Sequence, residues 1–309
     1  MTLTFTQSVD SNHHDEIIPF LQSFLTPESM EVQSQWDRVK CCHASRSLYC
    51  SECYQLLIPT AHWPRNLQAV TNNNTSRLLP FDLHVILQDR RKSATGLHAA
   101  VLDKVTRKQQ VIVVDMERNE SIPEYQERND TYMLFPSDDS VPLALVATKI
   151  QTLVVLDCKW THATVREHDS IATLPKVHLT NPPKESHYWR WHNAGSGMLS
   201  TMEAVYVAAK EVATKLSNIE HSDFSFLLWL FGLQRAAILR HTKNNEREAP
   251  FTNAGKEQQR ALRRQQGTVK ASLRSIETAD DTQQRVAKKP RWCSGLRNYD
   301  NNEEIEIVK

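Results

Sequence analysis

Glycine is scarce in this chain, with 7 residues among 309. Neither a G-x-G-x-x-G nor a G-x-x-x-x-G-K-[ST] motif occurs, and these loops are how Rossmann domains and P-loop proteins bring their backbone close to phosphates. The sequence therefore argues against both architectures. A nucleotide-containing ligand would have to be held by a different fold.

The chain also lacks long apolar runs and a strong net charge. Its most apolar stretch, residues 224–233, lies between Asp223 and Arg235 and falls short of the roughly 18 residues that a membrane helix needs. The first residues do not resemble a secretory signal, so we expect an intracellular protein without a membrane segment. The formal net charge is +1, so a polyanion would have to bind at local clusters of Lys and Arg.

The cysteines are unevenly spaced. Cys41, Cys42, Cys50 and Cys53 stand within 13 residues, and in a reducing compartment such clustering favours a metal site over disulfides. The C-x-x-C pair can give zinc two thiolates and the adjacent pair a third, while the fourth ligand is the remaining cysteine, His43 or a more distant residue. Buried free thiols are the alternative to this predicted zinc knuckle.

Short β-branched runs alternate with helix-like segments through the middle of the chain. This pattern predicts an α/β fold whose strands are buried on both faces of a parallel sheet. The predicted strands are Asp82–Leu87, Gln110–Asp115, Thr131–Phe135, Thr152–Asp157 and Lys176–Thr180. The predicted helices are Glu16–Leu25, Thr95–Lys104, His162–Thr173, Leu199–Leu216 and Asp223–Arg240.

Composition divides the chain into four parts. We predict a polar extension over residues 1–30, a zinc knuckle over 31–60, an α/β domain over 61–242, and a basic, then acidic, disordered tail over 243–309. Within the domain, Ser200 and Glu203 fit the S-x-x-E capping box, which predicts a helix start.

Two turns contain candidate ligand-binding or catalytic residues. Asp157 ends a hydrophobic strand, where ligands collect in open α/β sheets, although an Asp there is also a preferred helix N-cap. The segment from Lys92 to Gly96 follows another strand and precedes a helix, so its amides and hydroxyls can hold a polar ligand. Residues 188–192, YWRWH, mix rings with cations, which suits stacking on bases; an edge strand with surface aromatics is the alternative.

These segments together resemble the DTW-domain family. The matching motifs occur in family order and span residues 36–240. They are Tyr49-Cys50-x-x-Cys53-Tyr54, Lys92-Ser93 to His98, Leu156-Asp157-x-x-Trp160, Trp189-Arg190, and Leu199 to Val205 with the letters LSTMEAV. The resemblance implies a SPOUT-like, mainly parallel sheet with flanking helices, in which a knot is allowed, plus the N-terminal zinc knuckle.

The resemblance also implies the reaction. Relatives in the eukaryotic branch are tRNA-uridine aminocarboxypropyltransferases, which attach the 3-amino-3-carboxypropyl group of S-adenosylmethionine to uridine N3, often in the D-loop, and release methylthioadenosine. Asp157 then corresponds to the base or to the group that orients the uracil, and Trp160 packs beside it. The residues expected at the cofactor are Thr95, Gly96, Leu97, Leu156, Leu199, Ser200, Thr201 and Glu203.

The resemblance implies that the partner is tRNA. We expect its phosphates to be bound by Arg90, Lys92, Lys159 and Arg190. Eukaryotic relatives favour a nuclear location, with a cytoplasmic one as the alternative, and the run Lys288–Arg291 fits either a nuclear import signal or a further contact to RNA. The chain departs from the family where Lys159 replaces a threonine and Arg38 a cysteine. Two other readings stay open: a SPOUT-class RNA methyltransferase, and an inactive zinc-containing RNA-binding protein.

Overall fold

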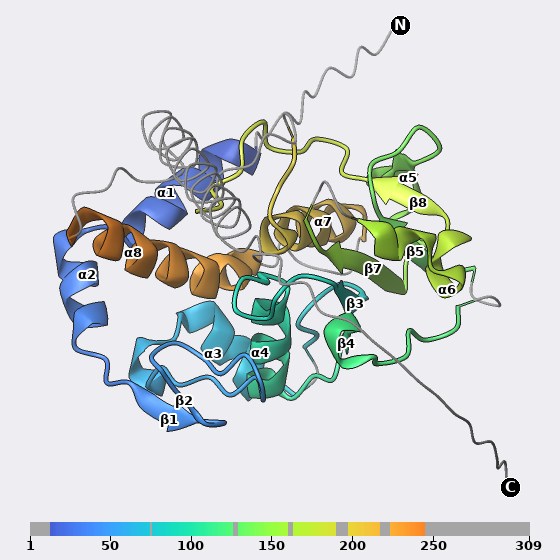
Figure 1. Cartoon of the computed structure of the whole chain (residues 1–309). Coiled ribbons are helices and arrows are strands. Elements are labelled where there is room, and N and C mark those ends of the chain that lie inside the picture. Colours follow the sequence, from blue (N-terminus) through green and yellow to red (C-terminus); the bar gives the residue numbers. More distant parts are fainter. Residues whose placement is uncertain are drawn as a thin grey trace, which may run out of the picture. The chain divides into compact units, whose positions relative to one another are not determined.

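A six-stranded parallel sheet forms the centre of the computed structural model (Figure 1). The strand order is β4-β3-β7-β5-β8-β6, and every neighbouring pair is parallel. The strands are β3 (Asp82–Leu87), β4 (Val111–Asp115), β5 (Thr131–Leu134), β6 (Val141–Pro142), β7 (Thr152–Asp157) and β8 (Lys176–His178). A separate antiparallel hairpin consists of β1 (Val39–Cys41) and β2 (Ala44–Arg46).

The structure describes residues 13–74, 76–125, 129–159, 163–189, 197–216 and 223–244. All of them lie in one compact unit, Met1–Lys256, and the second unit, Glu257–Lys309, lies outside the described residues. The predicted extension over 1–30 is thus described only in part, and the tail over 243–309 almost not at all. The predicted domain boundaries therefore stay predictions.

Helices flank the sheet. The α-helices are α1 (His13–Ser23), α2 (Pro27–Ser34), α3 (Arg65–Asn72), α4 (Leu97–Thr106), α5 (Leu143–Val146), α6 (Asp169–Ala172), α7 (Thr201–Lys215) and α8 (Trp229–Asn244). The 3₁₀-helices are η1 (Thr60–His62), η2 (Met116–Arg118), η4 (Thr164–Glu167) and η5 (Phe224–Leu228). None of the described helices is long and apolar enough to span a bilayer.

Both faces of the sheet are buried, as the near-continuous apolar runs predict. Alternate residues of each central strand enter different clusters: Val85 packs in the large cluster with residues of α4, α7 and α8, whereas Ile86 packs in a smaller cluster with Val165 of η4 and Ile171 of α6. The prediction of a mainly parallel α/β sheet with flanking helices is confirmed.

The predicted helix over His162–Thr173 is wrong in its described part. Residues from Ala163 onward form η4 and then α6, separated at His168. The backbone of His168 is extended, with φ −66° and ψ 132°, and its side chain caps α6 by accepting the N–H of Ser170. A residue that caps a helix has non-helical backbone angles, so it ends whatever helix precedes it. The prediction also missed β6 and the β1–β2 hairpin.

Candidate active site and cysteine cluster

Two carboxylates lie at the carboxyl-end edge of the sheet. Leu87, the last residue of β3, is in register with Asp115 on one side and with Asp157 on the other. Both carboxylates are buried, at 1% and 6% exposed. In parallel α/β sheets this edge is where ligands bind.

The two carboxylates differ in their charged neighbours. Asp115 Oδ2 accepts from Arg91 Nη1 at 2.6 Å and lies 3.4 Å from Arg118 Nε. Among the described residues, no Lys, Arg or His forms an ion pair with Asp157. Asp115 is therefore a neutralised structural anion, whereas Asp157 can exchange a proton.

Burial raises the pKa of Asp157 to about 7. Hydrogen bonds from the Gly96 N–H and the Thr201 side chain oppose this rise in pKa, and the negative charge of Asp89 adds to it. A carboxyl group with this pKa can take up or release a proton near neutral pH, which is the property of a general base.

Asp157 meets the start of α4 instead of capping a helix after its own strand. Its Oδ2 accepts the N–H of Gly96, the N-cap residue of α4, at 2.6 Å. A Cβ atom at position 96 would lie 2.8 Å from Asp157 Oδ2 and 2.8 Å from Val85 Cγ1. The absence of a side chain at position 96 is therefore what lets the turn approach the carboxylate so closely.

The two turns expected at the cofactor meet here. The N–H of Met202 donates to Thr95 Oγ1 at 3.2 Å, so the start of α7 is hydrogen-bonded to the turn before α4. The predicted capping box is confirmed: Ser200 accepts the N–H of Glu203, and the Glu203 carboxylate accepts the N–H of Ser200 at 2.9 Å. The site is thus assembled from β7 and the N-terminal ends of two helices.

The other residues expected at the cofactor are largely packed inside the protein. Leu97 is 0% and Leu199 3% exposed, and Leu156 packs against the smaller cluster under the opposite face of the sheet. Leu97 therefore presents no surface to a ligand, and Leu199 presents very little. Their assignment stays a prediction.

Of the expected RNA-binding residues, Arg90, Lys92 and Lys159 are exposed. Arg190 and the expected catalytic residue Trp160 lie outside the described residues. Trp189 is 5% exposed, and its ring packs tilted by 38° against the ring of Phe231 in α8, with 5.3 Å between the ring centroids. It is therefore a core residue and cannot stack on a base.

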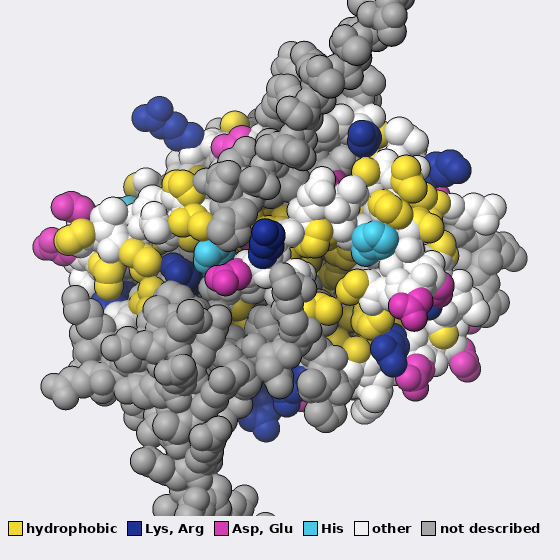
Figure 2. Space-filling model, turned by 90° about the horizontal axis from the view of Figure 1, so that it is seen from above, with side chains coloured by type: hydrophobic (Ala, Val, Ile, Leu, Met, Phe, Trp, Pro, Cys, Tyr) yellow, Lys and Arg dark blue, Asp and Glu magenta, His cyan; other side chains and the backbone are white. Residues whose placement is uncertain are grey.

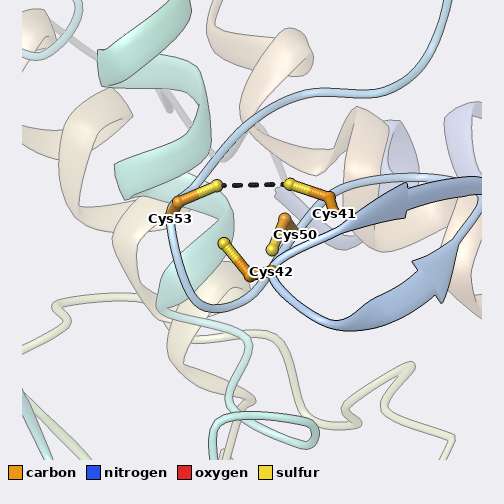
Figure 3. Close-up of side chains that lie close together, drawn as sticks. All are labelled: Cys41, Cys42, Cys50 and Cys53. Carbon is orange, nitrogen blue, oxygen red and sulfur yellow. Dashed lines mark hydrogen bonds between the residues drawn. The ribbon is translucent and has the colours of Figure 1, made fainter.

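The four clustered cysteines converge at one point (Figure 3). Their sulfur atoms all lie within 4.8 Å of one another, and the sulfurs of Cys41 and Cys53 are 3.5 Å apart. Sulfurs around a tetrahedral zinc ion are ~3.8 Å apart, because each Zn–S bond is ~2.3 Å long. The donor set fits zinc, and both adjacent cysteines belong to it.

Local backbone geometry brings the thiols together. Cys42 and His43 form the two-residue turn of the β1–β2 hairpin with φ of 44° and 65°, a left-handed conformation that non-glycine residues seldom adopt. His43 is exposed and outside the sulfur group. Burial raises the pKa of Cys50, but the backbone N–H groups of Cys53 and Glu52 outweigh it and lower the pKa to about 7. For Cys50 this favours the thiolate that metals bind, whereas hydrogen bonds with Cys53 raise the pKa of Cys41 and Cys42.

We expect Cys50→Ser and Cys53→Ser each to reduce bound zinc from about one ion per chain to almost none. A hydroxyl replaces a thiolate in the donor set, while the hairpin is unchanged. Atomic absorption on the purified protein measures the zinc content. Cys158→Ser, which alters a free cysteine outside the cluster, should retain the metal. Wild-type protein that binds no zinc would establish the alternative of buried free thiols.

Sequence reasoning missed the role of one residue at the site. Arg91 is 8% exposed and binds Asp115, yet the sequence presents it only as the middle of three consecutive basic residues, Arg90 to Lys92. Nothing in that run distinguishes a buried arginine from two solvated neighbours. Arg91 is buried because its partner, Asp115, ends β4. The pairing of β4 with β3 brings Asp115 next to the loop that follows β3.

The surface includes an apolar hollow. On the face seen in Figure 2, hydrophobic side chains gather around the hollow, and basic, acidic and His side chains lie near its rim. Small-molecule sites share this composition, with apolar walls and a few polar groups.

A protein-family model, described as the DTW domain, matches residues 41–239 of the chain. No curated protein matches the chain. Among solved structures, the chain is similar to that of the SAM-dependent rRNA:acp-transferase Tsr3 from Vulcanisaeta distributa, with 20% sequence identity and a TM-score of 0.30. The match covers 54% of this chain and 82% of that one.

Proposed function

Because the chain belongs to the DTW-domain family, we propose that it is a tRNA-uridine aminocarboxypropyltransferase that uses S-adenosylmethionine. The observation that carries the proposal is the buried carboxyl group of Asp157, held by Gly96 and Thr201 at the junction of β7, α4 and α7, with a pKa of about 7. The similar solved protein is an acp-transferase that acts on rRNA, whereas the motifs of this chain resemble the tRNA-modifying branch of the family.

Asp157 acts on the proton of the nucleophile. Uridine N3 forms a bond to the methylene carbon next to the sulfonium, and the carbon–sulfur bond breaks with its electron pair moving to sulfur. Methylthioadenosine leaves neutral, so it requires no acid. The N3 proton passes to the Asp157 carboxylate, which contributes about 10²- to 10⁴-fold to the rate.

The two turns align the reactants around this carboxylate. Thr95 to Leu97 and Leu199 to Thr201 hold S-adenosylmethionine, whose reactive carbon then lies near Asp157. Alignment of nucleophile, carbon and sulfur supplies a larger share of the acceleration than proton transfer does. The hydrogen bond between Met202 and Thr95 fixes the two turns relative to each other.

Exposed basic residues suit the RNA substrate. Arg90, Lys92 and Lys159 are solvent-accessible and lie in the segments that follow β3 and β7, so their charges are available to phosphates near the proposed reaction centre. A nuclear location belongs to the same proposal and has its support in the resemblance to eukaryotic relatives.

The test incubates the purified protein with unmodified tRNA and, separately, rRNA, each with S-adenosylmethionine, and analyses the digested nucleosides by mass spectrometry. Uridine heavier by one aminocarboxypropyl group in tRNA supports the proposal. The same product in rRNA alone would correct the RNA class, and a methylated nucleoside would establish a methyltransferase instead. RNA binding without cofactor binding would identify an inactive RNA-binding protein.

A further inference from the structure

The loop between β3 and α4, residues 88–96, contacts each part of the proposed site. The N–H groups of Gln88 and Asp89 donate to the carbonyl of Asp157 at 3.0 and 3.1 Å. The carbonyl of Ser93 accepts from the Tyr188 hydroxyl at 3.1 Å. At its end, Thr95 and Gly96 make the hydrogen bonds to α7 and Asp157 described above. Any displacement of this loop therefore changes the site.

Arg91, in the middle of this loop, binds the turn that carries two of the clustered cysteines. Its Nε donates to the carbonyl of Ser51 at 2.9 Å, and its Nη2 donates to the Tyr54 hydroxyl at 2.8 Å. The guanidinium also lies over the Tyr54 ring, 5.1 Å from its centre. Ser51 and Tyr54 are the neighbours of Cys50 and Cys53 in the chain, so Arg91 contacts the turn beside both thiols.

The same guanidinium is fixed on its other side. Its Nη1 donates to Asp115 at 2.6 Å, and Arg118 joins the group by an ion pair with Glu52. A planar guanidinium can satisfy three partners in fixed directions, which a lysine ammonium cannot reproduce. The position of the Cys50–Cys53 turn and the position of the 88–96 loop are therefore linked through one buried side chain.

We propose that Arg91 is a positioning residue that couples metal binding at the cysteine cluster to binding of S-adenosylmethionine at the site beside Asp157. When the metal holds the Cys50–Cys53 turn, the Ser51 carbonyl and the Tyr54 hydroxyl face Arg91, and the loop keeps Thr95 and Gly96 in place. The cluster is thus part of the cofactor site and not a separate module. This inference rests on the proposed function for the identity of the cofactor.

Coupling between two sites is reciprocal, so each ligand must raise the affinity for the other by the same factor. The test measures zinc affinity by competition with a chromophoric chelator, with and without saturating S-adenosylmethionine and with no RNA present. We expect the cofactor to tighten zinc binding at least about fivefold in the wild type, the lower end of typical coupling. Arg91→Ala and the milder Arg91→Lys should both reduce the factor to near one while zinc still binds.

The matched control is Arg77→Ala. Arg77 is also paired with an aspartate, Asp82, but its side chain is 57% exposed and contacts neither the Cys50–Cys53 turn nor the 88–96 loop. In this variant S-adenosylmethionine should therefore tighten zinc binding by the same factor as in the wild type. Independent binding of zinc and cofactor in the wild type would overturn the inference and leave the proposed function standing. An unchanged factor in both Arg91 variants would overturn the role of Arg91. Zinc-loaded protein that binds no cofactor would overturn the proposed function, and the inference with it.

Discussion

Asp157→Asn is expected to lower the rate of aminocarboxypropyl transfer by about 10²- to 10⁴-fold at saturating substrates, because an amide cannot accept the N3 proton. The amide oxygen can still accept the Gly96 N–H, so the turn before α4 should stay in place and cofactor affinity should change little. Single-turnover assays with labelled cofactor measure the rate, and calorimetry measures the affinity. A variant that transfers at the wild-type rate would show that Asp157 is not the base.

The pH dependence follows from the same carboxyl group. Because the pKa of Asp157 is raised to about 7, kcat/KM of the wild type should rise about tenfold per pH unit below this value, where the base is protonated, and level off above it. Asp89→Asn removes a negative charge that contributes to the raised pKa. This variant should move the inflection to lower pH without removing the base.

Stability should change in the opposite direction from activity. The folded state holds the Asp157 proton more tightly than the unfolded state, so the contribution of this group to wild-type stability is fully present below the ordinary carboxyl pKa and is lost as pH rises through about 7. Asparagine carries no charge to bury. Asp157→Asn should therefore be more stable than the wild type at pH 8.5, by an amount on the order of 4 kcal/mol, and the difference should shrink at pH 5. Urea unfolding at both pH values measures it.

Glu203→Ala is expected to lower the free energy of unfolding by roughly 3 to 5 kcal/mol, since it leaves the buried donors of Ser200 and the half-buried donors of Ser186 and His187 without this acceptor. The carboxylate is 1% exposed. It accepts from the Ser186 hydroxyl at 2.6 Å, from the His187 N–H at 2.7 Å, and from both the N–H and the hydroxyl of Ser200. Its geometry is that of an anchor between the 186–189 segment and the start of α7.

A matched control separates anchoring from cofactor recognition. Glu211, on the same helix, is also buried and accepts the N–H groups of Thr180 and Asn181 at 2.9 and 3.1 Å. Glu211→Ala should cost stability with no effect on cofactor affinity. If Glu203→Gln folds stably yet loses affinity for S-adenosylmethionine, Glu203 contacts the cofactor, as its predicted place in the cofactor site requires. If affinity stays unchanged, its role is the anchor alone.

Sequence patterns located the secondary structure well where its cause is local. Asp82–Leu87 and Thr152–Asp157 have the predicted bounds, because each is a short, mostly apolar run with β-branched residues, which is the pattern of a strand buried on both faces. The capping box depends on residues three positions apart, so it too could be read directly. The predicted helix after His162 is wrong because the side chain of His168 caps a new helix in its middle.

The sequence by itself therefore determined the parallel α/β class, the start of α7 and the candidate metal donors, since each depends on patterning or on spacing along the chain. Only the tertiary structure decided that Asp157 binds Gly96, 61 positions away, that Arg91 is buried between a cysteine turn and Asp115, and that Trp189 belongs to the core. The physical reason is that parallel strands pair only through long crossovers. Which side chains meet at their ends is therefore set by strand order and register, which no local pattern in the chain specifies.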